Sequence, residues 1–363
     1  MRLPPAREGR FYIPALDGIR GVAFLLVFAG HAGLYYVVPG GLGVTIFFFL
    51  SGYLITTLLR LEAQQRGTIS LRDFYMRRVI RILPPFYITL AIACLLGFCG
   101  VMSVVPKASA YLSAITFSLN YYALLPNGPV WAGPGMGVCW SLCIEEHFYL
   151  VFPFVYRFFL KRDLSPKTQV KILVAGCLFA LVWRTFLVFA FHIETATGTK
   201  WTYDATDCRF DSIVWGAILA IRNNAWFKDR GDGLLARSTN WAAVLGCAGL
   251  LFSLVYRNPV FRETARYTLQ GISLYAIFYY CIATEGSLVV RLLQNRALRW
   301  IGTLSYTLYL CHLYILNEFH ARYPHQLVLD AAVSFALALA FAWAMNRIVE
   351  RPMQRLRASF RQV

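Results

Sequence analysis

The sequence predicts an all-α, polytopic membrane protein with about ten transmembrane helices and both termini in the cytoplasm. Of the 363 residues, 58% are hydrophobic and 15% are charged, and the mean hydropathy is +0.54. Apolar runs of about 20 residues, the length that crosses a bilayer as a helix, recur along the chain. The formal charge of +17 would suggest nucleic acid in a soluble protein. Here the basic residues lie at the ends of the apolar runs, so we expect the bilayer, and no nucleic acid, as a partner.

Hydropathy places the predicted spans in order along the chain. A weaker apolar stretch at residues 109–125 is interpreted as a re-entrant or interfacial piece, because Pro126, Pro129 and Pro134 follow it closely. The ten predicted spans are residues 13–37, 42–60, 83–103, 138–160, 170–191, 208–222, 240–256, 267–284, 301–317 and 327–346.

The distribution of basic residues supports this topology. Of the 35 Lys and Arg residues, 26 fall in segments that ten spans place in the cytoplasm, and 6 fall in outer loops. Cytoplasmic loops of membrane proteins carry this excess of positive charge. We therefore expect residues 1–363 to form a single membrane-embedded domain, with a short basic cytoplasmic tail at 347–363 and no removable signal peptide.

The nine cysteines lie mostly in apolar segments, without the spacing of metal ligands. We expect them to act as small packing residues and expect no metal site.

Arg20 and His31 lie in the first predicted span. Their separation of eleven residues corresponds to a net rotation of about 20° on an ideal helix, so both should project from one face. Inside a membrane such side chains must face a polar cavity or find partners. His31 could be a helix-packing histidine or a catalytic one, and its position alone does not decide between the two.

Further polar residues fall in the outer halves of later spans. A histidine near a carboxylate is suited to deprotonating a hydroxyl group, because the carboxylate orients the imidazole and stabilises its charged form. We therefore predict a shared outer cavity, with His31, Glu145 and Glu146 as catalytic residues. The predicted acceptor-side residues are Trp140, Ser141, Arg209, Asp211 and His312.

Arg78 and Arg81 lie on the predicted inner side, three residues apart on one side of a helix. Paired guanidinium groups suit the phosphates of a nucleotide-bearing donor. An ordinary cytoplasmic anchor that follows the positive-inside rule explains them equally well.

These motifs together resemble the acyltransferase-3 family of membrane O-acyltransferases. Arg20 with His31 matches the family's Arg-x10-His motif, and Arg78 with Arg81 matches its Arg-x-x-Arg motif. The resemblance covers nearly the whole chain, and further landmarks follow in order: Phe49-Leu50-Ser51-Gly52-Tyr53-Leu54-Ile55, Trp140-Ser141-Leu142 with Glu145-Glu146, Arg209-Phe210-Asp211, Ser305-Tyr306-Thr307-Leu308-Tyr309-Leu310 with His312, and Glu350-Arg351-Pro352.

The resemblance implies an acyl-CoA co-substrate, commonly acetyl-CoA, and no tightly bound cofactor. It also implies an acceptor hydroxyl on a cell-envelope carbohydrate or glycolipid, such as a polysaccharide or lipopolysaccharide, and a place in the bacterial inner (cytoplasmic) membrane. The CoA moiety would bind against Arg20, Arg78 and Arg81. Many relatives carry a fused periplasmic hydrolase-like domain. Either the membrane domain completes the transfer, or a separate periplasmic partner does.

Three alternatives remain open from the sequence. A polytopic transporter would also place charges within its spans, although we find no internal symmetry of the transporter type. A catalytically idle sensor would tolerate changes at His31 and Glu146. An acyltransferase acting on a small hydroxylated natural product would differ only in its acceptor.

Overall fold

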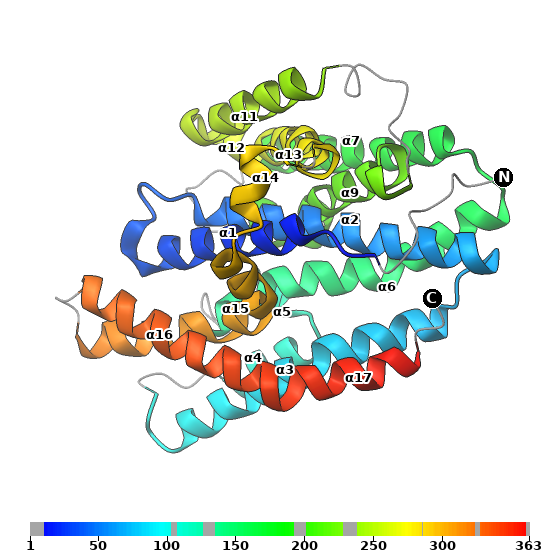
Figure 1. Cartoon of the computed structure of the whole chain (residues 1–363). Coiled ribbons are helices and arrows are strands. Elements are labelled where there is room, and N and C mark those ends of the chain that lie inside the picture. The colour runs from blue at the N-terminus through cyan, green and yellow to red at the C-terminus, as the bar shows by residue number, and fades with distance from the viewer. Residues whose placement is uncertain are drawn as a thin grey trace. The chain divides into compact units, whose positions relative to one another are not determined.

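The computed structural model describes residues 11–102, 107–125, 135–191, 201–227, 238–284, 286–323 and 327–360. Helices and turns make up these residues, and they contain no strand (Figure 1). Pro126, Pro129 and Pro134 lie outside the described residues. The prediction of an all-α protein is confirmed.

Six segments of the described residues are long and apolar enough to cross a membrane. They are Pro14–Leu34, Gly40–Arg66, Leu71–Phe98, Met136–Lys161, Pro166–Phe191 and Val328–Leu356. The chain is therefore an integral membrane protein. The same six match the first to fifth and the tenth predicted spans.

The other four predicted spans also fold as helices. They are α9 (Thr206–Arg222), α11 (Thr239–Val255), α13 (Arg266–Ala283) and α15 (Arg296–Arg322). The weak stretch at 109–125 forms two short helices, α4 (Ala108–Ile115) and α5 (Leu119–Tyr122). Eight helical residues extend only about 12 Å, well short of the hydrocarbon core of about 30 Å. Neither short helix can span the bilayer.

The chain divides into two compact units that interleave in sequence. Unit 1 comprises Met1–Ile19, Val44–Ile69 and Ile144–Arg299, and unit 2 comprises Arg20–Gly43, Ser70–Cys143 and Trp300–Val363. We predicted a single domain from the sequence. That prediction depends on how the two units pack together, and it stays a prediction.

Unit 1 is built on α7 (Pro166–Phe191), α9, α11 and α13, with part of α2 (Gly40–Arg66). Helix α13 packs against both α9 and α11, and α9 packs against α7 (Figure 1). Two glycines bring α2 and α9 close together. A Cβ atom on Gly52 would lie 1.9 Å from the Ile213 carbonyl oxygen, and one on Gly216 would lie 1.9 Å from the Phe49 carbonyl oxygen. Small residues allow this close backbone approach in membrane helices.

The C-terminal end of α9 is capped by side chains of α2. Arg60 is buried and donates hydrogen bonds to the carbonyl oxygens of Ala220 and Ile221, which belong to the last turn of α9. A cation there interacts favourably with the negative end of the helix dipole. Tyr53 and Thr57 both hydrogen-bond to Asn224, just beyond the same helix end.

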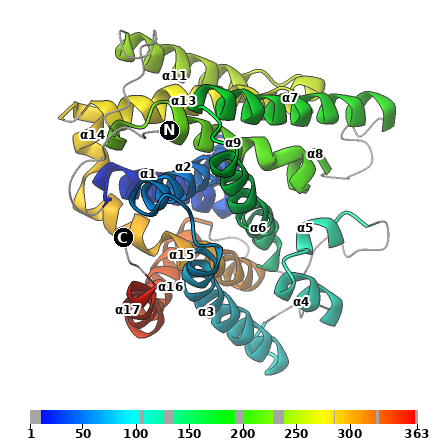
Figure 2. The ribbon, with the colours of Figure 1, turned by 90° about the vertical axis from the view of Figure 1, so that its right-hand side faces the viewer.

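Unit 2 contains α3 (Leu71–Phe98), α16 (Leu327–Met345), η5 (Asn346–Glu350) and α17 (Arg351–Ser359). Figure 2 shows α17 lying along α3, in agreement with their packing. Helix α3 begins twelve residues before the predicted span. Ser70 caps its N-terminus by accepting a hydrogen bond from the backbone N–H of Asp73, and the helix continues through Pro84 and Pro85.

Helix α15 connects the elements of unit 2. The Tyr306 hydroxyl donates to the Ile82 carbonyl oxygen in α3, at 3.0 Å. The Thr307 hydroxyl donates to Glu350 Oε1 in η5, at 2.6 Å. These bonds show that Tyr306 and Thr307 of the Ser305-to-Leu310 motif, together with Glu350, link neighbouring helices.

The first membrane helix changes geometry where it carries His31. Helix α1 (Pro14–Ala29) is regular, but Gly30–Leu34 forms a π-turn, η1, in which Gly33 has φ 95°. A Cβ atom on Gly30 would lie 3.0 Å from the Cα atom of Gly40, so the chain returns closely on itself here. The ideal rotation between Arg20 and His31 therefore applies only as far as Ala29.

Candidate active site

Two histidines that are 281 residues apart in sequence meet in unit 2. His31 Nδ1 lies 2.9 Å from His312 Nε2, and their rings stack at a centroid distance of 5.1 Å with an angle of 22° between the ring planes. His31 is exposed, whereas His312 is completely buried. The pair therefore combines an accessible imidazole with a buried one behind it.

The buried histidine is held by its own helix and by aromatic rings. His312 Nδ1 lies 3.1 Å from the Leu308 carbonyl oxygen and 2.8 Å from the Tyr309 carbonyl oxygen. The ring of Phe24 meets the His312 ring edge to face, at 5.7 Å, and the ring of Phe28 lies at 6.3 Å. This shell fixes the orientation of the imidazole.

Ser141 fixes the turn of α15 that precedes His312. Its hydroxyl lies 2.7 Å from the Tyr309 hydroxyl, and both groups also approach the Val138 carbonyl oxygen at 3.1 Å. Val138 belongs to η2 (Met136–Val138), directly before α6 (Cys139–Lys161). The structure therefore brings two predicted acceptor-side residues, Ser141 and His312, into one bonded cluster. Their contact with an acceptor stays a prediction.

Three other predicted residues of unit 2 are half-buried: Arg20 on α1, Trp140 in the first turn of α6, and Arg81 on α3. Arg78, also half-buried, lies over the ring of Phe74, with 5.6 Å from its guanidinium carbon to the ring centroid. Binding of acyl-CoA by these arginines stays a prediction.

The two predicted catalytic carboxylates belong to unit 1. Glu145 and Glu146 are half-buried on α6, and Glu145 Oε2 accepts a hydrogen bond of 2.8 Å from the Tyr149 hydroxyl. The Tyr149 hydroxyl also lies 3.0 Å from Ser51 Oγ. The predicted contact of these carboxylates with His31 joins residues of different units, and it stays a prediction.

A buried ion pair joins three helices of unit 1. Arg184 on α7 contacts Asp211 Oδ2 on α9 at 2.9 Å, and both side chains are fully buried. Thr268 on α13 also bonds to both partners. The carbonyl oxygens of Cys208 and Thr264 accept the remaining donors of Arg184. Asp211 Oδ2 thus bonds to side chains of two neighbouring helices. The predicted contact of Asp211 with an acceptor stays a prediction.

Arg209 occupies an aromatic box beside this ion pair. Its guanidinium carbon lies 3.7 Å from the centroid of the Tyr267 ring, 5.5 Å from that of Tyr203 and 5.6 Å from that of Phe48. Burial raises the pKa of Tyr203 to about 12, so this residue faces the arginine as a neutral ring. Nη2 of Arg209 donates to Thr45 at 3.1 Å, while Nε and Nη1 have no hydrogen-bond partner among the described residues.

A polar pair on α16 was not predicted from the sequence. Asp330 is the charged residue of α16, and it shares a buried stripe with Ser334 and Ala338. Within the described part of the chain, Asp330 Oδ2 and Ser334 Oγ lack hydrogen-bond partners. Helix α16 packs against the π-turn that carries His31. A lone buried acid in a membrane helix is a signal of function that the sequence already contained.

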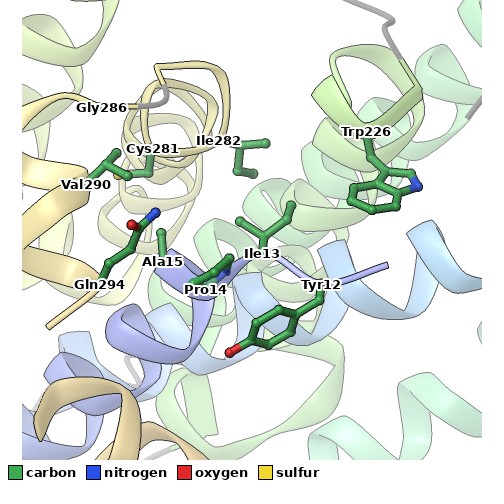
Figure 3. Close-up of a pocket in the computed structure, with 10 residues that line it drawn as sticks. All are labelled: Tyr12, Ile13, Pro14, Ala15, Trp226, Cys281, Ile282, Gly286, Val290 and Gln294. Atoms are coloured by element: carbon green, nitrogen blue, oxygen red, sulfur yellow. The ribbon is translucent and has the colours of Figure 1, made fainter. Parts of the chain in front are cut away.

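A cavity of about 400 Å³ opens in unit 1, where the start of the first helix meets α13 and α14 (Leu288–Leu293). Figure 3 shows Tyr12 and Trp226 on one side of it and Cys281, Val290 and Gln294 on the other. Its lining residues include none of the predicted site residues. This cavity is therefore separate from the histidine pair and does not indicate where a substrate would bind beside it.

All nine cysteines are free thiols, and six of them are buried, in agreement with a packing role. The described residues contain no group of three or more His, Cys, Asp or Glu side chains placed to hold a metal ion.

Comparison with known families identifies the family of the chain. The family profile Acyl_transf_3, described as an acyltransferase domain, matches residues 13–347, which include both histidines. The chain belongs to the acyltransferase-3 family. It therefore carries an acyltransferase domain, and the resemblance inferred from the motifs is confirmed.

Curated relatives in this family are named as O-acetyltransferases. The chain is 28% identical to "Peptidoglycan O-acetyltransferase OatA" of Listeria monocytogenes over 96% of its own length and 57% of that protein. It is 30% identical to "O-acetyltransferase OatA" of Staphylococcus aureus over 95% of its own length and 57% of that protein. The chain thus spans a little over half the length of the curated relatives that it matches. No solved structure matches the acyltransferase-3 chain.

Proposed function

We propose that this chain is a membrane O-acyltransferase that moves an acetyl group from cytoplasmic acetyl-CoA to a hydroxyl of a cell-envelope carbohydrate. The name of the Listeria monocytogenes relative makes peptidoglycan the first acceptor to test. The proposal includes ten spans, both termini in the cytoplasm, and a place in the bacterial inner membrane. The observation that carries the chemistry is the exposed His31, hydrogen-bonded to a buried histidine within an apolar helix unit.

In this proposal His31 is the general base. It takes the proton of the acceptor hydroxyl as that oxygen attacks the thioester carbonyl carbon. The new carbon–oxygen bond forms, the carbon–sulfur bond breaks, and the proton passes from His31 to the departing CoA thiolate. Arg78 and Arg81 would hold the CoA phosphates on the inner side, with Arg20 along the path of the pantetheine arm. Glu145 or Glu146 would support the charged imidazole.

A transient acyl carrier is the alternative chemical role for His31. The imidazole would then attack the thioester itself and pass the acetyl group to the acceptor in a second step. Rapid denaturation at neutral pH, after incubation with labelled acetyl-CoA in the absence of acceptor, separates the two routes, because an acetylated imidazole hydrolyses quickly in acid. Only the carrier route leaves label on the protein.

The test of the function is acetyl transfer by the purified chain in proteoliposomes with radiolabelled acetyl-CoA. The acceptor panel contains peptidoglycan fragments, other envelope glycans and small hydroxylated natural products. We expect label in a carbohydrate product. We also expect His31→Ala to reduce the rate by about 100- to 10,000-fold, because a general base contributes that much. His320→Ala, at an exposed histidine on α15, is the matched control.

Transfer by His31→Ala at the wild-type rate would remove His31 from the mechanism. Uptake of an envelope compound into the vesicles without formation of an acetylated product would favour a transporter instead.

A further inference from the structure

The hydrogen bonds around His312 determine which of its nitrogens carries the proton. Nδ1 lies 2.8 Å from the Tyr309 carbonyl oxygen and 3.1 Å from that of Leu308. A carbonyl oxygen can only accept a hydrogen bond, so Nδ1 must be the donor. A neutral imidazole has one N–H group, and its other nitrogen is an acceptor. Nε2 of His312 is therefore an acceptor.

The tautomer of His312 determines that of His31. Because Nε2 of His312 accepts, the contact of 2.9 Å requires Nδ1 of His31 to donate. The proton of the neutral His31 ring then resides on Nδ1, and the lone pair resides on Nε2. His312 is completely buried, and rings of Phe24, Phe28 and Tyr309 surround it, which favours its neutral form.

We propose that His312 is a positioning residue, which fixes the tautomer and the orientation of His31 so that Nε2 of His31 is the basic nitrogen. The proposal rests on the proposed function and deepens it at the same site. His312 takes the place that a carboxylate holds beside a catalytic histidine in many hydrolases. Ser141 and Tyr309 contribute indirectly. Their hydroxyl contact holds in place the turn of α15 whose two carbonyl oxygens bond to His312.

A histidine in this place has a chemical consequence that a carboxylate would not have. The far side of His312 ends on backbone carbonyl oxygens, which cannot take up a proton. A proton accepted at Nε2 of His31 therefore has no relay behind the pair. It must leave from the same nitrogen, to the CoA sulfur, before the next cycle.

The decisive experiment observes the tautomer directly, without any need for turnover. The protein is prepared with ¹⁵N-labelled histidine, and its six histidines give ring nitrogen signals in lipid bilayers. The signals of His31 are identified by their loss in His31→Gln. We expect wild-type His31 to have a protonated Nδ1 and an unprotonated Nε2. His312→Leu removes the acceptor and should give a mixture of both tautomers.

Two further variants complete the set. His312→Gln keeps an acceptor at the end of its side chain and should restore the wild-type tautomer of His31. His320→Gln, on the same helix, should change neither the tautomer nor the rate. For transfer, we expect His312→Leu to lower kcat by about 10- to 100-fold, as loss of an orienting partner does at other sites. KM should change little, and His312→Gln should recover most of the loss.

Protonation at Nε2 of wild-type His31, or an unchanged tautomer in His312→Leu, would overturn the proposal. If His312→Leu does not fold, the wild-type and His312→Gln spectra still decide. Absence of acetyl transfer together with the expected tautomer would reject the proposed function and leave the positioning role of His312 in place.

Discussion

The polar residues around the histidine pair in unit 2 comprise one exposed side chain and two buried ones. His31 is exposed, whereas Ser141 and His312 are buried and bonded to α15 and to the segment before α6. The sequence singled out all three, but it grouped Ser141 and His312 with the acceptor. Local spacing identifies polar residues within a span. It does not reveal which of them will meet across 281 positions of chain.

The arginines near the start of α3 also differ in their surroundings. Arg77 donates to the carbonyl oxygen of Phe360, at 3.2 Å, and so ties α3 to the end of the chain. Arg78 lies over the Phe74 ring, and Arg81 is half-buried one turn further on. The sequence analysis singled out Arg78 and Arg81 by their spacing, and the structure shows a separate contact for Arg77.

This difference gives a prediction at the residue scale. Arg78→Ala combined with Arg81→Ala should weaken binding of acetyl-CoA at least tenfold, because charge-assisted bonds to phosphate are among the stronger polar contacts. Isothermal calorimetry of the protein in detergent measures the affinity, and Arg77→Ala is the matched control. Equal affinity for the double variant and the wild type would count against donor binding at these arginines.

Among the described elements of unit 2, α15 makes side-chain hydrogen bonds to several others. It bonds to α3 through Tyr306, to η5 through Thr307 and to the segment before α6 through Tyr309, and it carries His312. The sequence predicted a span of 17 residues here, and the helix has 27. Hydropathy failed at its ends because charged residues there reduce the apolar score without ending the helix. The extension of α3 toward Leu71 has the same cause.

The close approach of α2 and α9 gives a prediction at the element scale. Gly52→Ala or Gly216→Ala should destabilise the protein by about 1–3 kcal/mol, because the added methyl group meets backbone atoms that have little room to move. Thermal unfolding in detergent measures the effect. Gly176→Ala is the control, because its Cβ atom would lie 3.7 Å from a side-chain atom of Phe210 and it adds the same helix propensity. An equal loss of thermal stability in Gly176→Ala would show that the close approach of α2 and α9 is not the cause.

For the whole molecule, the sequence predicted helical character and approximate helix positions well. Each predicted span coincides with a helix, because apolar length is a local property of the chain. The division into two interleaved units could not be predicted, since it depends on which helices pack together. The π-turn at His31 was also missed, because ideal-helix geometry was assumed from Pro14 onward.

The ten-span topology gives a prediction for the whole molecule. Cys99, an exposed thiol just past the end of α3, should react with a membrane-impermeant thiol reagent added to intact cells. A Gln354→Cys thiol on α17 should react only after permeabilisation, because seven further spans separate the two positions. The other exposed cysteines, Cys94 and Cys247, are first replaced by Ala. Labelling of both positions from outside would require an even number of intervening spans.

Helices α2, α3 and α15 have 27 or 28 residues each, which corresponds to a length of about 40 Å. A typical hydrocarbon core is only about 30 Å thick, so a helix of this length that crosses it must tilt or project into the lipid headgroups. For α15 this consequence rests on the proposed ten-span topology. Because α15 is one continuous helix, a change in its tilt moves both of its ends. The thickness of the surrounding bilayer therefore affects the position of the turn that contains His312. Assays of this protein should keep the lipid chain length constant.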